Sequence, residues 1–131
     1  MSCSPRQLLA AATSIGIKGN TEALHRATAS RAYYAAYHAA KAYHDRLASP
    51  GSVAYAKGGM HEVLHTQLRY PTVADAKAKA ESRALGNLLM AVYALRVNAD
   101  YKPEQDFLAT AGLAALEKAS TIIEAINQVH A

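Results

Sequence analysis

The amino-acid sequence predicts an all-α fold: an antiparallel four-helix bundle with one short extra helix, forming a single domain over residues 1–131. Alanine is abundant and β-branched runs are few, a composition typical of closely packed helices. Apolar residues recur every three or four positions through most of the chain, which is the spacing of one helix face. No strand-like alternation extends beyond a few residues, and the chain is long enough to bury one core.

Two helices are expected before residue 52. Ser4 followed by Pro5 is typical of a helix start, and the apolar spacing continues to Gly16. Thr21 is a suitable N-cap for a second, much longer helix. The Ser-Pro-Gly sequence at residues 49–51 is expected to end it.

A short helix and a long one are expected next. After a loop at residues 50–58, Gly59–Tyr70 is predicted to be a short helix that Pro71 ends. Thr72 then opens a long helix that ends near Asn98. Its apolar positions form one continuous stripe, made of Leu85, Leu88, Leu89, Val92 and Leu95.

The last predicted helix covers residues 104–130, from Glu104 to His130, after a turn at 99–103. Its apolar positions again recur at helical spacing. No internal repeat or low-complexity tract interrupts the chain, so we expect one domain without a linker.

Composition restricts the classes of function without selecting one. The formal net charge is +4 and the isoelectric point is near 9.3, which permits nucleic-acid binding but does not require it. The single cysteine, Cys3, excludes an intrachain disulfide and fits a reducing compartment. No apolar run is long enough to span a membrane and no leader is evident, so we expect a mature, soluble, cytoplasmic protein.

Arg31 and His38 are the first candidate functional pair. Seven positions bring a helical side chain back to within about 20° of its starting direction, so both residues lie on one stripe. The three- and four-residue neighbours of Arg31 include no acid, so its partner must come from another helix, a second chain or an anionic ligand. In the simplest alternative, Arg31 pairs with a neighbouring carboxylate and His38 only packs.

The second helix also predicts a homodimer. It is apolar nearly all round, so one face is expected to meet the bundle and the other a second chain. We place Ala35 and Ala42 on that seam with Arg31 and His38. The four tyrosines of this helix, which could stack bases, are more often core or interface residues at such spacing.

Three segments carry a family resemblance. They are SRAYYAAYHAAKAY at residues 30–43, KGGMHEVLH at 57–65 and LRVNADY at 95–101. In this order they resemble the HEPN domain family, most closely its small stand-alone branch. The resemblance implies a helical bundle that is usually a dimer. Many members are metal-independent ribonucleases, whereas others bind nucleotides or act as inactive partners, in toxin–antitoxin or phage-defence systems. An antitoxin or a nucleotidyltransferase is therefore an expected partner, besides RNA or a nucleotide.

The resemblance also assigns site residues. The family's nuclease signature is an arginine, four to six residues and a histidine, which Arg31 and His38 satisfy, so they are the predicted catalytic pair. In the best-known nucleases the signature lies on a later helix and is followed by tyrosine. Here that place is Arg96 to Tyr101, with Asp100 where histidine would stand. The alternative for Arg96 and Asp100 is an ion pair four residues apart that closes a helix.

Two chains would explain how the predicted catalytic pair works together. The axial rise of about 10.5 Å between Arg31 and His38 is long for both to reach one phosphate from one helix. An antiparallel crossing would place the arginine of one chain near the histidine of the other. One histidine would take the 2′-hydroxyl proton, the arginine would stabilise the phosphate charge, and a 2′,3′-cyclic phosphate would form without a metal. Further residues are predicted to contact RNA: Tyr34, Lys41, Lys57, His61, Arg96, Asp100 and Tyr101.

The sequence leaves other classes open. The segment HEVLH matches the HExxH pattern, in which His61 and His65 would bind zinc with Glu62 as the base. The segment is short and lies between a Gly-Gly pair and a proline, so we expect neither a metal nor another cofactor. The remaining alternatives are a non-catalytic partner that binds nucleotide or protein, and a helical RNA-binding subunit of a larger complex that uses surface cations such as Lys77, Lys79 and Arg83.

Overall fold

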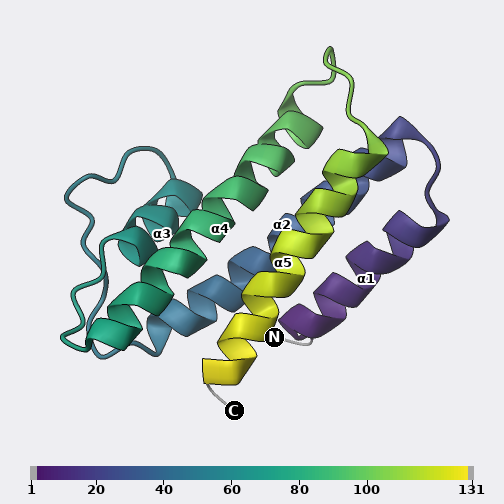
Figure 1. Ribbon diagram of the computed structural model, residues 1–131. Coiled ribbons are helices and arrows are strands. Elements are labelled where there is room, and N and C mark those ends of the chain that lie inside the picture. The colour runs from purple at the N-terminus through teal and green to yellow at the C-terminus, as the bar shows by residue number, and fades with distance from the viewer. Residues whose placement is uncertain (1–2, 130–131) are drawn as a thin grey trace.

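The computed structural model describes residues 3–129, which form five helices and no strand (Figure 1). The predicted all-α class is therefore confirmed for these residues. The helices are α1 Pro5–Lys18, α2 Glu22–Asp45, α3 Met60–Arg69, α4 Ala76–Tyr101 and α5 Ala109–Val129. No helix in the described range is long and apolar enough to cross a membrane.

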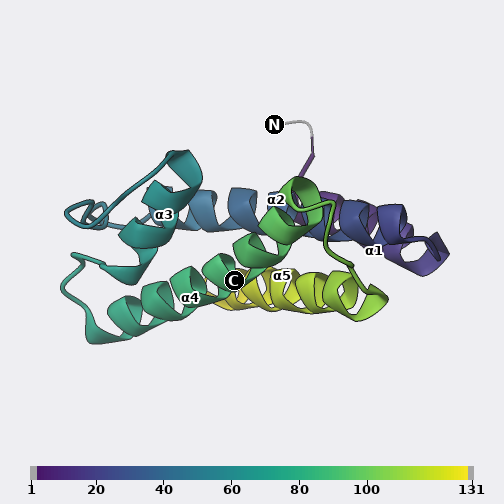
Figure 2. The ribbon, with the colours of Figure 1, turned by 90° about the horizontal axis from the view of Figure 1, so that it is seen from above.

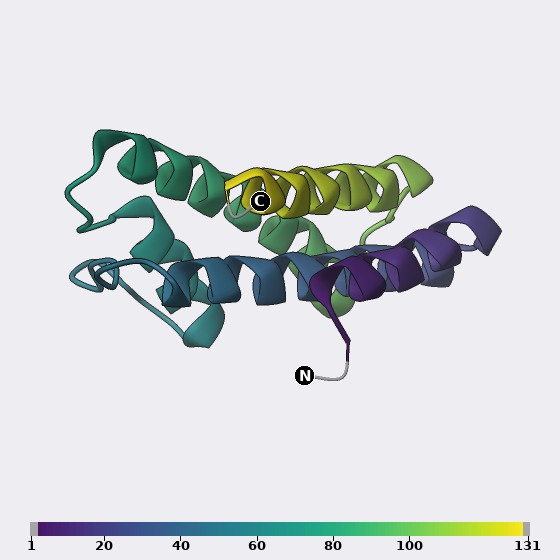
Figure 3. The same ribbon diagram turned by 90° about the horizontal axis from the view of Figure 1, so that it is seen from below.

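Helix α2 is the central element of this helical bundle, because it contacts each of the other four helices. α1 packs on α2 and α5, whereas α3 contacts only α4 and α2. Two further views show α1 beside one end of α2 and α3 beside the other (Figures 2 and 3). The α3 end of the bundle is the one that carries the candidate site.

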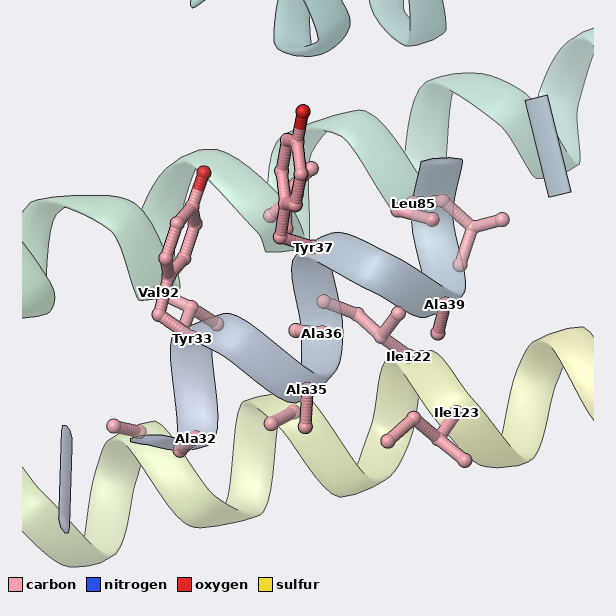
Figure 4. Close-up of a cluster of buried hydrophobic side chains, with 14 of the residues drawn as sticks. Ala32, Tyr33, Ala35, Ala36, Tyr37, Ala39, Leu85, Val92, Ile122 and Ile123 are labelled. Atoms are coloured by element: carbon pink, nitrogen blue, oxygen red, sulfur yellow. The ribbon is translucent and has the colours of Figure 1, made fainter. Parts of the chain in front are cut away.

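Small side chains bring α2 and α5 together. Ala32 and Ala35 of α2 are fully buried and are directed toward α5, whereas Tyr33 and Tyr37 point to the opposite side of the helix (Figure 4). Alanine keeps high helix propensity and occupies little volume, so the two helices can approach closely. Tyr33 and Tyr37 are thereby directed toward α3 and α4.

The predicted dimer seam is wrong at Ala35. This residue has no exposed surface because it packs inside its own chain. At 100° per residue it lies about 40° from Arg31, which is enough to turn it into the bundle. The outward stripe of α2 consists instead of Arg31, Tyr34 and Lys41, which are exposed, with His38 half-buried between them.

Helix α4 differs from its predicted span at both ends. It begins at Ala76, because the Asp75 carboxylate accepts a hydrogen bond from the Ala78 backbone N–H at 2.8 Å. Thr72 instead donates its hydroxyl to the Pro50 carbonyl at 2.8 Å. At the other end the helix passes Asn98 and continues to Tyr101, so three of the five residues of the predicted turn at 99–103 are helical.

Arg26 explains where α4 ends and why the last helix starts late. Its guanidinium donates to the carbonyls of Asn98 and Ala99, both at 3.0 Å, and of Lys102 at 3.2 Å, and it also bonds the Gln105 carbonyl. The Glu22 carboxylate accepts from Arg26 at 2.8 Å and from the Phe107 N–H at 2.9 Å. These bonds hold residues 102–108 as a loop, so α5 begins at Ala109 rather than Glu104. Its predicted end at His130 lies outside the described residues.

The first two helices also differ slightly from prediction. α1 runs two residues past Gly16, to Lys18. α2 ends at Asp45, four residues before the Ser-Pro-Gly breaker. The chain turns early because the buried His44 ring accepts a hydrogen bond from the Gly51 N–H at 3.0 Å, which draws the following loop back over the helix end.

Helix α3 occupies its predicted place, with Gly59 as N-cap and Tyr70 as C-cap. It lies close to α4 at Gly86, where an added Cβ would come within 3.0 Å of the Leu68 Cβ and 2.8 Å of the Arg69 Cγ. The buried Ser82 hydroxyl of α4 donates to the Leu68 carbonyl at 2.6 Å. This contact fixes the position of α3 and of the histidines on it.

Candidate functional site

A pocket of about 410 Å³ opens between α2, α3 and α4. Its lining is mostly aromatic and cationic and consists of Ser30, Arg31, Tyr33, Tyr34, Tyr37, His38, Met60, His61 and Arg96. The structure thus brings both members of the predicted catalytic pair into one cavity, together with three of the predicted RNA-contacting residues. No carboxylate contributes to the lining.

Arg31 is exposed at the mouth of this pocket. Among the described residues no carboxylate lies within ion-pair distance of it, and its guanidinium carbon lies 5.9 Å from the centre of the Tyr34 ring. A neighbouring helix therefore does not supply the carboxylate that the simplest alternative required. The charge is available to an anion.

His38 lines the same pocket as Arg31 and packs edge-on against two tyrosines. The ring centres are 4.3 Å apart for Tyr34 and 5.4 Å for Tyr37. Burial lowers the pKa of His38 below its ordinary value, and Lys41 lowers it further. The imidazole is therefore mainly neutral at pH 7, which is the state that accepts a proton.

The second arginine of the pocket is held by its own helix. Arg96 donates from Nε to the Asp100 carboxylate at 2.9 Å and from Nη2 to the Tyr101 hydroxyl at 3.2 Å. The Ser30 hydroxyl of α2 donates to the same Asp100 oxygen at 3.1 Å. Asp100 and Tyr101 do not line the pocket, so this geometry agrees with the ion-pair alternative, in which the carboxylate orients Arg96.

His61 reaches the pocket from α3. Its Nδ1 lies 2.9 Å from the Tyr33 hydroxyl, which is also 3.1 Å from Nε2 of the buried His65. Burial lowers the pKa of His61, as does Arg96. Burial also lowers the pKa of His65, to about 4, and raises that of Tyr33. All three groups are therefore uncharged near neutrality.

The HExxH alternative does not fit this geometry. A zinc protease needs both histidines on the metal and the glutamate aimed at a bound water. Here both imidazoles bind the Tyr33 hydroxyl, while the Glu62 carboxylate accepts from the Tyr93 hydroxyl at 2.8 Å and from the Gly59 N–H at 3.1 Å. Within residues 3–129 no group of three metal-ligating side chains comes together.

Two predicted RNA-contacting lysines lie outside the pocket. Lys41 is paired with Asp45 at 3.2 Å, and Lys57 is exposed in the loop before α3.

The sequence analysis did not predict two contacts of the site: the hydrogen bond from the Ser30 hydroxyl to Asp100, and the Tyr33 hydroxyl that bridges His61 and His65. Helical spacing could have indicated the position of Tyr33. It lies two residues from Arg31, so its side chain faces the bundle rather than solvent.

These residues form an open cavity lined by two neutral imidazoles and two guanidinium groups. Phosphate oxygens are suitable ligands for such donors, and the tyrosine rings offer faces on which bases can stack. No protein-family model, curated protein or solved structure matches the chain.

Proposed function

We propose that the protein is a HEPN-like four-helix bundle with one extra helix, which binds RNA in the α2–α3–α4 pocket and cleaves it without a metal. The observation that carries this proposal is one cavity lined by Arg31, which has no ion pair among the described residues, and by the neutral His38, together with His61 and Arg96. The family resemblance of the same segments supports it, as does the basic net charge. A cytoplasmic toxin–antitoxin or phage-defence module is the proposed setting.

In the proposed reaction His38 removes the proton from a ribose 2′-hydroxyl. The 2′-oxygen attacks phosphorus, the bond to the 5′-oxygen breaks, and that oxygen takes a proton as it leaves. Arg31 stabilises the charge that develops on the non-bridging oxygens. The products are a 2′,3′-cyclic phosphate and a 5′-hydroxyl. No redox partner is involved, the leaving oxygen takes its proton from water, and the proposed assembly is a homodimer that pairs the exposed stripes of two α2 helices.

A specific observation favours one competing function. Asp100 stands where the later signature carries histidine, and its carboxylate is engaged by Arg96 and Ser30. These contacts support a role for Asp100 in orienting Arg96 rather than as a catalytic acid. The competing function is a non-catalytic HEPN-like partner that holds a nucleotide or an anionic protein segment in the same pocket.

The test is incubation of the purified protein with mixed RNA in excess EDTA. Cleavage should persist, leave cyclic phosphate ends and fail on DNA. Arg31→Ala and His38→Ala should each reduce the rate by about 10²- to 10⁴-fold while leaving the melting temperature unchanged. Arg46→Ala and His25→Ala are matched controls, since the pocket includes neither residue.

The outcomes separate the candidates. RNA that is bound but not cleaved supports the non-catalytic partner. Activity that EDTA removes and zinc restores would refute the metal-free reaction and favour His61 and His65 as zinc ligands. Full activity of a folded His38→Ala protein would move the reaction away from this residue.

A further inference from the structure

Three neutral groups form a continuous chain from the core to the pocket. The buried His65 contacts the Tyr33 hydroxyl through Nε2 at 3.1 Å, and Tyr33 contacts Nδ1 of His61 at 2.9 Å. His65 is 4% and Tyr33 2% exposed, whereas His61 lines the pocket. Two of the three members are thus sealed from solvent and cannot exchange their hydrogen bonds for water.

The protons of this chain are coupled. A neutral imidazole carries one N–H, and the Tyr33 hydroxyl has one proton to donate. If Tyr33 donates to His61 Nδ1, it must accept from His65 Nε2–H, and His61 then carries its proton on Nε2. If Tyr33 donates to His65, then Nδ1 of His61 carries the proton and its Nε2 is bare. In both cases Nε2 is the ring nitrogen of His61 that remains for a ligand.

The ligand chemistry selects between the two arrangements. Arg31 and Arg96 make the pocket cationic, and an ionised phosphodiester has acceptor oxygens only. Such an anion needs an N–H from His61, not a lone pair. Three tyrosine rings fix the orientation of the His61 imidazole. Its ring centre lies 4.7 Å from that of Tyr37, 5.8 Å from that of Tyr93 and 5.4 Å from that of Tyr33.

We infer that His65, Tyr33 and His61 form a neutral hydrogen-bond relay that presents His61 Nε2–H to a phosphodiester bound between the two arginines. His61 is then a substrate-binding residue, and Tyr33 and His65 position it. This role rests on the proposed RNA-binding pocket but not on cleavage. It is completed by one chain, because α2 supplies Tyr33 and α3 both histidines. The burial that keeps His65, Tyr33 and His61 uncharged supports the assignment.

The test uses a 2′-O-methyl RNA hexamer, which cannot be cleaved because its 2′-oxygens carry no proton. Long-range ¹H–¹⁵N NMR of the imidazoles should show both His61 and His65 in the Nε2–H form in the complex. Tyr33→Phe should disturb the His61 tautomer and weaken hexamer binding by about tenfold, the effect of one hydrogen bond to a charged group. His65→Leu should act like Tyr33→Phe, whereas His65→Gln keeps a donor and should restore part of the affinity.

Tyr93→Phe is the matched control, because it removes a hydroxyl of the same cluster that contacts Glu62 and leaves His61 Nδ1 untouched. A bound complex with His61 in the Nδ1–H form, or wild-type affinity in folded Tyr33→Phe, would overturn the relay. Hexamer binding with the expected tautomers but no cleavage of natural RNA would sustain the relay and refute the nuclease. Absence of hexamer binding would refute both.

Discussion

Replacing Asp100 with asparagine separates its two possible roles most directly. The change keeps the shape of the side chain and an acceptor for Ser30, and it removes only the charge that Arg96 faces. The side chains of Arg96 and Asp100 are 21% and 27% exposed, so we expect a stability cost near that of an exposed pair four residues apart, about 0.5 kcal/mol. For a chain of this length that lowers the melting temperature by about 2 °C.

RNA binding should change in the opposite direction. Removal of a negative charge about 6 to 8 Å from a bound phosphate is worth roughly 0.5 to 0.7 kcal/mol in water, or about a two- to threefold gain in affinity. The gain should appear at low salt and disappear at high salt, because screening shortens the reach of the charge. Fluorescence anisotropy with a labelled single-stranded RNA at two salt concentrations measures it.

A matched control comes from two helices that do not line the pocket. Glu124→Gln removes the acid of the Arg6–Glu124 pair between α5 and α1, and it should change affinity less. Loss of cleavage in Asp100→Asn with unchanged RNA binding would refute the reasoning, because Asp100 would then take part in the chemistry. A melting temperature lower by 10 °C would also contradict it.

Three further outcomes are expected. Arg31→Ala should weaken RNA binding several-fold at low salt. It should leave the denaturation midpoint unchanged, because among the described residues Arg31 forms no ion pair that the variant would lose. A large fall in the midpoint would show that Arg31 has a structural role. Burial holds the pKa of His65 at about 4, below its ordinary value, so the unfolded chain binds more protons than the folded chain as the pH falls. The free energy of unfolding should therefore be highest above pH 6.5 and decrease by up to about 3 kcal/mol as the pH drops toward 4. Thermal melts of the wild type and of His65→Leu across this range should show a flatter profile for the variant, and equal profiles would contradict the assignment. Light scattering should find a dimer, and Tyr34→Glu should split it because Tyr34 is exposed on α2. Ala35→Glu should instead unfold the chain, because the new charge would be buried. A wild-type monomer at micromolar concentration would refute the dimer proposal.

The sequence predicted the helices well where local signals were strong. Ser4 with Pro5, and Gly59 with Pro71, mark ends that the structure reproduces within two residues. It failed where a distant side chain decides the end of a helix. The end of α4 depends on Arg26, which is more than 70 positions away in the sequence, and no local pattern reveals that contact.

The candidate site was also predictable only where it depends on spacing within one helix. Helical spacing alone placed Arg31 and His38 on one stripe, and both line the pocket. The same periodicity could not show that α3 and α4 bring His61 and Arg96 to that stripe, because the relative position of helices depends on packing at residues such as Gly86. The pairing of Asp100 with Arg96 was available as an alternative from spacing, but the Ser30 contact was not.

The Arg26 contacts have a consequence for how the loop at residues 102–108 can change during evolution. Arg26 hydrogen-bonds the loop and the end of α4 through backbone carbonyls, which every amino acid possesses. Its one side-chain contact in the loop that the structure gives is with Phe107, whose ring centre lies 5.5 Å from the guanidinium carbon. The carbonyl contacts place no demand on the other side chains of the loop. Related sequences would be expected to vary through the loop except at position 107, while keeping an arginine at position 26 and an acid at position 22, four residues before it.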